Sequence, residues 1–290
     1  MEGRRKNTNQ PNLPMSKPTT EGFYVYCITS EDGPKRFNVR GIDNKSEVFV
    51  LGYKDLGAVV SIINLSDFGE GELKKKLDDL KWTKRAVLNH QRVINKVMDG
   101  RTVLPMKFGV IYKTRDQIQN VLGKNYYKFK NLLKSLAEKK EWGVKVYYNQ
   151  SESNRKIQIN ENPIKKLKEK IKKSPEGIKF FLQKKIEATE GLALERGINK
   201  YSEIFLKRLE RSSARYVLNE ILSRELTGKQ EEMVINAAYL VDDKNFLKFD
   251  KELADLKDKY SKNGFLFELS GPWPPYNFVN LDLDKSKQAK

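Results

Sequence analysis

The chain has 290 residues, 38% of them hydrophobic and 32% charged, and its 56 Lys and Arg against 38 Asp and Glu give a formal net charge of +18 at pH 7. That length suffices to bury the core of one large or two modest domains, whereas no stretch has the roughly 18 consecutive apolar residues that a membrane helix needs. A single cysteine and a single histidine exclude an internal disulfide and a Cys/His zinc site. No apolar segment follows the basic residues near the N-terminus, so we expect no secretory signal and a cytoplasmic protein.

The two ends of the chain are dominated by polar and charged residues. Residues 1–21 and 280–290 bury too little apolar surface to offset the entropy of ordering, and they are predicted to be disordered tails. Between them, a mostly polar stretch at 151–163 separates two candidate domains, residues 22–150 and residues 151–279.

The segment 22–150 alternates between strand and helix patterns. β-branched and aromatic residues predict strands over 23–29, 48–53, 57–63, 103–112 and 142–148. A helix is predicted from Gly69–Gly71 to Gly100, and Thr114 is predicted to cap a second helix that reaches about Lys139. With a tight hairpin turn at Lys54-Asp55, this order favours a ferredoxin-like sandwich with helices on one sheet face.

Two details of this first domain can be tested. The first long helix has an apolar face at the spacing i, i+3, i+4, i+7, formed by Ala86, Val87, His90, Val93, Ile94, Val97 and Met98. Pro105 cannot donate a hydrogen bond to a neighbouring strand, which predicts an edge position or a bulge for that part of the sheet.

The segment 151–279 contains the longer helices. Ser174-Pro175 is a helix start, and an apolar stripe from Ile178 to Leu209 predicts one long helix or a helical hairpin. A further helix is predicted over 214–226. A strand at Met233–Val241, a helix at Asp243–Lys262 and a strand at Phe265–Leu269 complete an α+β domain. The predicted fold class is therefore α+β, with an N-terminal ferredoxin-like sandwich and a C-terminal α+β domain with long helices.

No catalytic motif was found along the chain. The phosphate-binding loop G-x-x-x-x-G-K-[ST], the dinucleotide turn G-x-G-x-x-G and the nucleophile elbow G-x-S-x-G are all missing from the sequence. Cys27 lies in an apolar strand, where a buried and inert thiol is expected. We therefore expect no enzyme activity and no cofactor. A lysine run over 165–173 leaves open a basic RNA-binding protein on a ferredoxin-like scaffold, although Lys107-Phe108-Gly109-Val110 matches the RNA-recognition motif poorly.

One C-terminal segment stands out on physical grounds. Three prolines in four positions restrict the backbone directly after a predicted strand, and large aromatic side chains lie between them. The segment consists of Gly271, Pro272, Trp273, Pro274, Pro275, Tyr276, Asn277 and Phe278, and we call it the aromatic clasp. Two interpretations remain open: the clasp packs back on its own domain, or it is an exposed docking surface.

The aromatic clasp resembles the hallmark of the gas vesicle protein F/L family, in which a strand ends in S/T-G-P-W-P-P-Y-x-F. Other stretches agree with the family in the same order: 24–26, 57–61, His90 on a helix, 103–109 and 141–146. The resemblance covers about residues 22–279. Lys107 stands where the family is expected to have Arg, which weakens the idea of a bidentate contact there.

The resemblance implies a non-catalytic accessory or minor structural protein. Members of this family are needed for gas vesicle formation and are thought to contact the small hydrophobic shell protein and other accessory proteins. The residues expected to be structurally central or in contact with a partner are Leu104, Pro105, Lys107, Phe108, Gly271, Pro272, Trp273, Pro274, Pro275, Tyr276 and Phe278. Subtypes F and L are too alike to be separated from one sequence.

Overall fold

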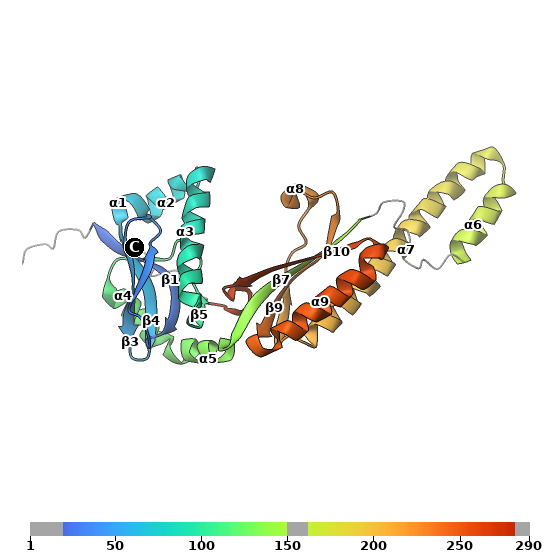
Figure 1. The fold of residues 1–290 in the computed structure, drawn as a ribbon. Helices are drawn as coiled ribbons and strands as arrows, with labels where there is room; N and C mark the ends of the chain where they lie inside the picture. The colour runs from blue at the N-terminus through green and yellow to red at the C-terminus, as the bar shows by residue number, and fades with distance from the viewer. Residues whose placement is uncertain (1–19, 150–161, 282–290) are drawn as a thin grey trace, which may run out of the picture. The chain divides into compact units, whose positions relative to one another are not determined.

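The computed structural model describes residues 20–149 and 162–281, which form two compact units (Figure 1). The first unit contains residues 20–99 and 106–129, and the second contains 100–105 and the described residues from 130 onward. The strand Val103–Pro105 nevertheless pairs in the sheet of the first unit, and the helix Tyr126–Leu136 begins in the first unit and ends in the second. Most of the predicted disordered tails and of the polar stretch at 151–163 lies outside the described residues, but Glu21, assigned to the first tail, is the first residue of a strand. Each unit has its own antiparallel sheet, as the α+β prediction requires.

The sheet of the first unit has the strand order β2-β3-β4-β1-β5, and β6 also pairs with β1. Its strands are β1 (Glu21–Ser30), β2 (Arg36–Arg40), β3 (Glu47–Tyr53), β4 (Leu56–Asn64), β5 (Val103–Pro105) and β6 (Ile111–Tyr112). The hairpin turn at Lys54-Asp55 is confirmed, with Lys54 at φ 54°. β5 ends the strand order, so Pro105 does lie on an edge strand. β2 was not predicted, and the strand predicted over 103–112 is divided into β5 and β6.

The helices of the first unit are α1 (Leu65–Phe68), α2 (Glu70–Lys76), α3 (Leu80–Met98), α4 (Arg115–Lys124) and α5 (Tyr126–Leu136). The single helix predicted from Gly69 to Gly100 is therefore broken. The break occurs because the Asp79 carboxylate caps α3, accepting hydrogen bonds from the backbone N–H groups of Lys81 and Trp82. The predicted cap at Thr114 is confirmed, as part of a capping box with Gln117.

Helices cover both faces of this first sheet. Tyr24 and Ser61 face α3, whereas Tyr53 faces the opposite side, where its hydroxyl group lies against Gly123 of α4. Figure 1 shows α3 and α4 on opposite sides of the strands. This arrangement differs from the predicted sandwich with helices on one face, and it explains why β1 and β4 are buried at nearly every position.

The sheet of the second unit has the order β10-β7-β9-β8. Its strands are β7 (Lys139–Tyr148), β8 (Arg215–Leu218), β9 (Glu232–Asp242) and β10 (Phe265–Trp273). β7 was predicted to belong to the first sheet but pairs with β9 and β10 instead. The helix predicted over 214–226 is wrong: this region forms β8 and the short helix α8 (Arg224–Thr227), because Tyr216 and Val217 pair with the edge of β9.

Two long helices cover one face of the second sheet, α7 (Glu176–Glu210) and α9 (Phe246–Tyr260). Their buried residues Phe205, Leu209, Phe249, Leu253 and Leu256 pack against Val144, Val146, Tyr239 and Phe267 of the strands. Short 3-10 turns η2 (Asp243–Asn245), η3 (Ser261–Asn263) and η4 (Tyr276–Phe278) adjoin β9, α9 and β10. Gly264, at φ 88°, ends the α9 region, as predicted.

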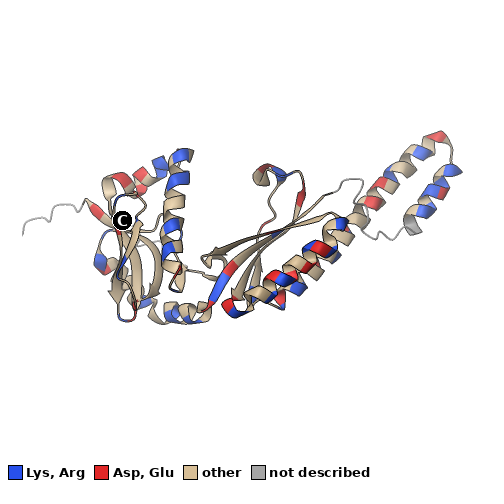
Figure 2. Cartoon of the chain, in the orientation of Figure 1, with Lys and Arg blue, Asp and Glu red and all other residues tan. Residues whose placement is uncertain are grey.

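The region from Ile178 to Leu209 is one uninterrupted helix, so the first of its two predicted alternatives is confirmed. The N-terminal part of α7 packs against α6 (Asn162–Lys172), a helix that was not predicted. Pro175 is the N-cap residue of α7, so the helix begins at Glu176, one residue after the start predicted from Ser174-Pro175. Lys and Arg are dense along α6 and the adjoining part of α7 (Figure 2). Within the described residues, no helix has the length and apolar character needed to cross a membrane.

Candidate protein-interaction surfaces

A hydrogen-bonded cluster in the first unit holds the segment that follows β5. The Tyr24 hydroxyl oxygen lies 3.0 Å from His90 Nδ1, and His90 Nε2 lies 3.2 Å from the carbonyl oxygen of Met106. Because a carbonyl only accepts, Nε2 carries the proton and Nδ1 accepts from Tyr24. Gly109 N–H in turn donates to the Tyr24 oxygen over 3.0 Å. The network ties residues 106–109 to β1 and α3.

Burial keeps the His90 imidazole neutral. The side chain is 3% exposed, and desolvation lowers its pKa from 6.5 to about 4, against the opposing effect of the Met106 carbonyl. Its sequence position on the apolar face of the helix is confirmed, together with Ala86, Val93, Ile94 and Val97, whereas Val87 is 44% exposed. His90 therefore serves here as a packed, neutral hydrogen-bonding residue.

The four candidate residues of this region have different environments. Leu104 and Pro105 are buried in the sheet, and Lys107 is exposed. Phe108 is half-buried, with its ring centroid 5.8 Å from that of His90. It packs inside the cluster instead of projecting from the sheet as the stacking aromatics of an RNA-recognition module do. Of the four, Lys107 alone has a side chain well placed to meet a partner.

The aromatic clasp begins with a backbone turn that only glycine tolerates. Gly271 has φ 125°, and the Gly271–Pro272 peptide bond is cis. A Cβ atom built on Gly271 would lie 3.0 Å from the carbonyl oxygen of Glu141 and 3.1 Å from the ring of Trp142. Both the positive φ and the close approach to β7 therefore require glycine at this position.

Glu141, in the middle of the second sheet, fixes the other end of the clasp. Its carboxylate accepts the backbone N–H of Asn277 at 3.0 Å and the Asn277 side-chain amide at 2.7 Å. Burial raises the pKa of Glu141, and the two hydrogen bonds from Asn277 oppose that rise. Neither residue was singled out from the sequence. Glu141 precedes the strand predicted over 142–148 and follows two lysines, so nothing in the local sequence marked it as a buried carboxylate.

The clasp is buried at one end and exposed at the other. Pro274, Pro275 and Phe278 are buried, and the Arg215 guanidinium lies 5.4 Å from the centroid of the Phe278 ring. Gly271, Pro272 and Trp273 are exposed, Trp273 to 40%. The C-terminal end of the clasp thus packs back on its own domain, which was the first of the two interpretations. Contact with a partner stays a prediction for the exposed end around Trp273.

The hairpin of α6 and α7 carries a second exposed apolar surface. The side chains of Ile178, Phe180, Phe181 and Leu192 are 51%, 63%, 72% and 55% exposed. Ile186, in contrast, is 2% exposed where α6 packs. The sequence placed Ile178 on the inward stripe of α7 and did not identify Phe181 as exposed, because helical spacing alone does not show how wide a sector α6 covers.

The described residues contain no group of three or more His, Cys, Asp and Glu side chains arranged to hold a metal ion. Cys27 is fully buried in β1. The exposed apolar side chains around Trp273 and along α7 are typical of surfaces that pack against other macromolecules.

Comparisons with known proteins place these features in a family. The family model of gas vesicle synthesis protein GvpL/GvpF matches residues 22–280. Gas vesicle protein L of Streptomyces sp. (strain CB03234) is 27% identical over 274 residues, covering 92% of this chain and 97% of that protein. Gas vesicle protein F1 of Halobacterium salinarum is 25% identical over 273 residues, covering 93% and 98%.

Solved structures show the same fold. The crystal structure of GvpF from Anabaena sp. PCC7120 matches with a TM-score of 0.68 at 18% identity, covering 91% of this chain and 100% of that one. GvpF from Microcystis aeruginosa matches with a TM-score of 0.63 at 20% identity, covering 90% and 99%.

Proposed function

The chain belongs to the gas vesicle GvpL/GvpF family, and on this premise we propose that it is a non-catalytic accessory or minor structural protein of gas vesicles. In this proposal it acts in the cytoplasm and at the vesicle, where it binds the small hydrophobic shell protein and other accessory proteins during assembly. A shell subunit with exposed apolar surface would aggregate before it is incorporated. A protein with a complementary apolar surface would hold such a subunit until then.

The exposed apolar surface of the α6–α7 hairpin is the observation that carries this proposal. Ile178, Phe181 and Leu192 are separated by three, eleven and fourteen positions, all close to whole turns of an α-helix. They therefore lie along one side of α7, beside the stripe that packs on α6. Aromatic and aliphatic side chains left exposed in a row are typical of a surface on which another helix or an apolar segment packs.

Co-expression with the small shell protein, followed by affinity purification at about 0.3 M salt, tests the proposal. The Debye length at this salt is roughly 6 Å, which screens contacts made only by charge. We expect the wild-type chain to retain the shell protein and the double substitution Phe181→Ser with Leu192→Ser to reduce retention about tenfold, because both side chains are exposed and their loss spares the core.

Leu247→Ser is the matched control, since Leu247 is 82% exposed on α9. It should retain the shell protein as the wild type does. If the wild type retained none, and nucleic acid co-purified at low salt instead, the shell-binding function would be wrong and a basic RNA-binding role would replace it. If the wild type retained it but the double variant did so equally, the function would stand with another contact surface. In that case Trp273→Ala is the next variant to measure.

A further inference from the structure

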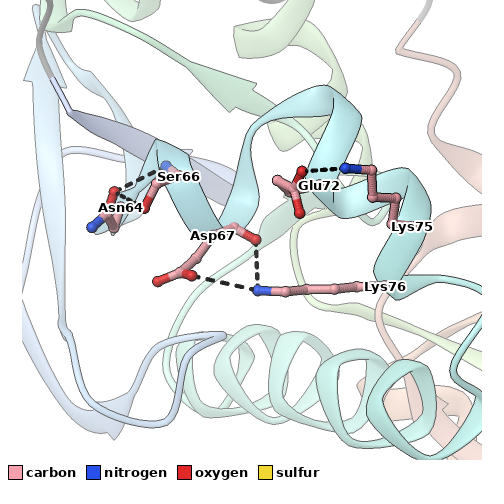
Figure 3. Close-up of polar contacts among 6 residues, drawn as sticks. All are labelled: Asn64, Ser66, Asp67, Glu72, Lys75 and Lys76. Atoms are coloured by element: carbon pink, nitrogen blue, oxygen red, sulfur yellow. Dashed lines mark hydrogen bonds and ion pairs between the residues drawn. The ribbon is translucent and has the colours of Figure 1, made fainter.

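A groove in the first unit lies outside the surfaces described so far. It has a volume of about 900 Å³ and runs between α3 on one side and α1, α2 and the β2–β3 turn on the other. Phe68 and Trp82 contribute its apolar lining, and Arg85, Asn89 and Arg92 come from α3. Figure 3 shows the wall formed by α1 and α2.

The helix along this groove is basic over its whole length. α3 contains Lys81, Lys84, Arg85, Arg92 and Lys96 and has no acidic residue between its caps. Arg85 and Arg92 are seven positions apart, which is close to two helical turns, so both project on the groove side with Asn89 between them. The guanidinium of Arg92 donates to the side-chain oxygens of Asn44 and Asn89, which are neutral.

The acidic residues of the groove wall are already occupied. The Asp43 carboxylate accepts the backbone N–H groups of Lys45 and Ser46 and the Ser46 hydroxyl. Although burial opposes it, these bonds lower the pKa of Asp43. Asp67 is engaged by Lys76, whose Nζ donates to its backbone oxygen at 2.8 Å and lies 3.7 Å from Oδ1 (Figure 3).

Two guanidinium groups therefore remain without a carboxylate. In the part of the chain that the structure describes, no ion pair of Arg85 or Arg92 is found, whereas Lys75 and Lys76 nearby pair with Glu72 and Asp67. Arginine forks bind carboxylates in a bidentate manner and strongly. The groove thus has along one side two guanidinium groups that lack an ion-pair partner among the described residues, and the ammonium of Lys76 lies 5.2 and 5.8 Å from the ring centroids of Phe68 and Trp82.

We propose that this groove binds an extended, acidic peptide segment of a partner protein. Two carboxylates of that segment pair with Arg85 and Arg92, and an apolar side chain between them packs against the half-buried Trp82. The rise along α3 between the two arginines is about 10 Å. Residues i and i+3 of an extended polyproline-like segment are about 9 Å apart and lie on one face. The recognised motif therefore has two acidic residues three positions apart.

A peptide fits this groove better than a nucleic acid does. Asn44, Asn64 and Asn89 line the groove, and their amides match the alternating donors and acceptors of a peptide backbone. A phosphate backbone carries a charge on every unit, whereas α3 presents two guanidinium groups about 10 Å apart to the groove. Half-buried Trp82 gives a single ring to pack on, not the row of exposed rings that stacks successive bases.

Fluorescence anisotropy with a labelled peptide tests this site. The probe is a short peptide with Asp-Pro-Leu-Asp in a Gly/Ser background, and the same peptide with Asn for both Asp is its control. The full chain should bind the acidic probe and not the Asn version. Arg85→Gln with Arg92→Gln should weaken binding about tenfold or more, because both charge-assisted pairs are lost.

A second double substitution separates the site from the overall charge. Lys170→Gln with Lys173→Gln removes the same charge from exposed positions at the end of α6 and directly after it and should change the affinity less than about twofold. Equal weakening by both double variants would overturn the proposal, because it would mean attraction by net charge alone. The proposal would also be overturned if single-stranded RNA displaced the probe and lost affinity with the same two arginines. Circular dichroism of each variant confirms that the fold is kept.

This test is independent of the shell-protein experiment. The groove variants lie in the first unit and the hairpin variants in the second. Hairpin variants that no longer retain the shell protein should therefore still bind the peptide.

Discussion

His90 in the first unit and Glu141 in the second have comparable positions in their units. Each is almost fully buried, at 3% and 4% exposure, and each holds a segment that leaves the sheet. His90 holds Met106 after β5, and Glu141 holds Asn277 after β10. Their surroundings differ, because His90 is bound by groups from two separate segments, whereas Asn277 alone donates two hydrogen bonds to the Glu141 carboxylate.

The same burial acts on these two side chains with opposite consequences. Desolvation disfavours the charged form of each group, so it lowers the pKa of the imidazole and raises the pKa of the carboxyl group. The partners of His90 are neutral, so a neutral imidazole fits them, and at pH 7 its burial has no cost from a charged form. Burial raises the pKa of Glu141, and the two hydrogen bonds from Asn277 favour its ionised form against that rise. The buried Glu141 carboxylate therefore relies on one partner residue, Asn277, whereas the His90 imidazole has two, Tyr24 and Met106.

Acidification is expected to produce the largest difference between the units. The pKa of His90 is about 4 in the folded chain and 6.5 in the unfolded chain, so the unfolded state binds more protons between these values. Stability from this group is complete above pH 6.5 and is lost as the pH falls to 4, by about 3 kcal/mol. For Glu141 the sign is reversed. Its pKa is raised in the folded chain, so the stability that this group contributes is complete below its ordinary pKa of 4.5 and is lost as the pH rises through the folded value.

Urea unfolding at several pH values measures this difference. Trp82 reports on the first unit when Trp142 and Trp273 are replaced by Phe, because these two lie in the second. The Trp82 transition should move to lower urea between pH 6.5 and 4, and His90→Gln should remove most of that dependence. A wild-type transition that stays constant over this range would show that His90 is protonated in the fold.

The turn at Gly271 offers the next largest effect. Gly271→Ala adds a Cβ at φ 125°, at 3.0 Å from the Glu141 carbonyl, and should destabilise the second unit by about 2 kcal/mol. Gly191→Ala is the matched control, because it lies inside α7 with no atom within 4 Å of the added Cβ. It should stabilise the helix by up to about 1 kcal/mol. Equal effects in thermal unfolding would contradict the strain assigned to Gly271.

Local patterns of this chain were predictable, and long-range pairing was not. The turn at Lys54-Asp55, the cap at Thr114 and the glycine after α9 follow from residues a few positions apart. The sheet that β7 joins depends on β9 and β10, which are far away in sequence, and nothing in the strand itself distinguishes the two sheets. β8 was read as a helix because a short apolar group fits both periods.

The same distinction applies to the candidate surfaces. The composition of the aromatic clasp marked it as unusual, but its attachment to Glu141 joins residues 136 positions apart and has no sequence signal. The basic residues of α3 were visible as charges. Their place along a groove depends on where α1, α2 and the β2–β3 turn lie, which only the fold determines.

Asn277→Ala is expected to have the smallest effect and to test the dependence of Glu141 on a single partner most directly. It removes the 2.7 Å bond to Oε1 and leaves the backbone N–H on Oε2, so the second unit should lose about 1 kcal/mol. The pKa of Glu141 should rise further, because a contact that lowers it is gone. The loss should therefore be larger at pH 7 than at pH 4, where a protonated carboxyl group needs fewer donors.

Asn280→Ala is the control for this substitution, as Asn280 is exposed two positions after Phe278 and should change stability by less than about 0.5 kcal/mol. Hydrogen exchange of the clasp amides, with Trp273 fluorescence as a second probe, measures whether the clasp opens before the sheet does. Faster exchange confined to the amides of residues 276–278 would mean that Asn277 controls a local opening. If the protection of the clasp amides against exchange fell together with the global stability, the clasp would be an integral part of the second core. Trp273 would then lie on a surface as stable as the sheet beneath it.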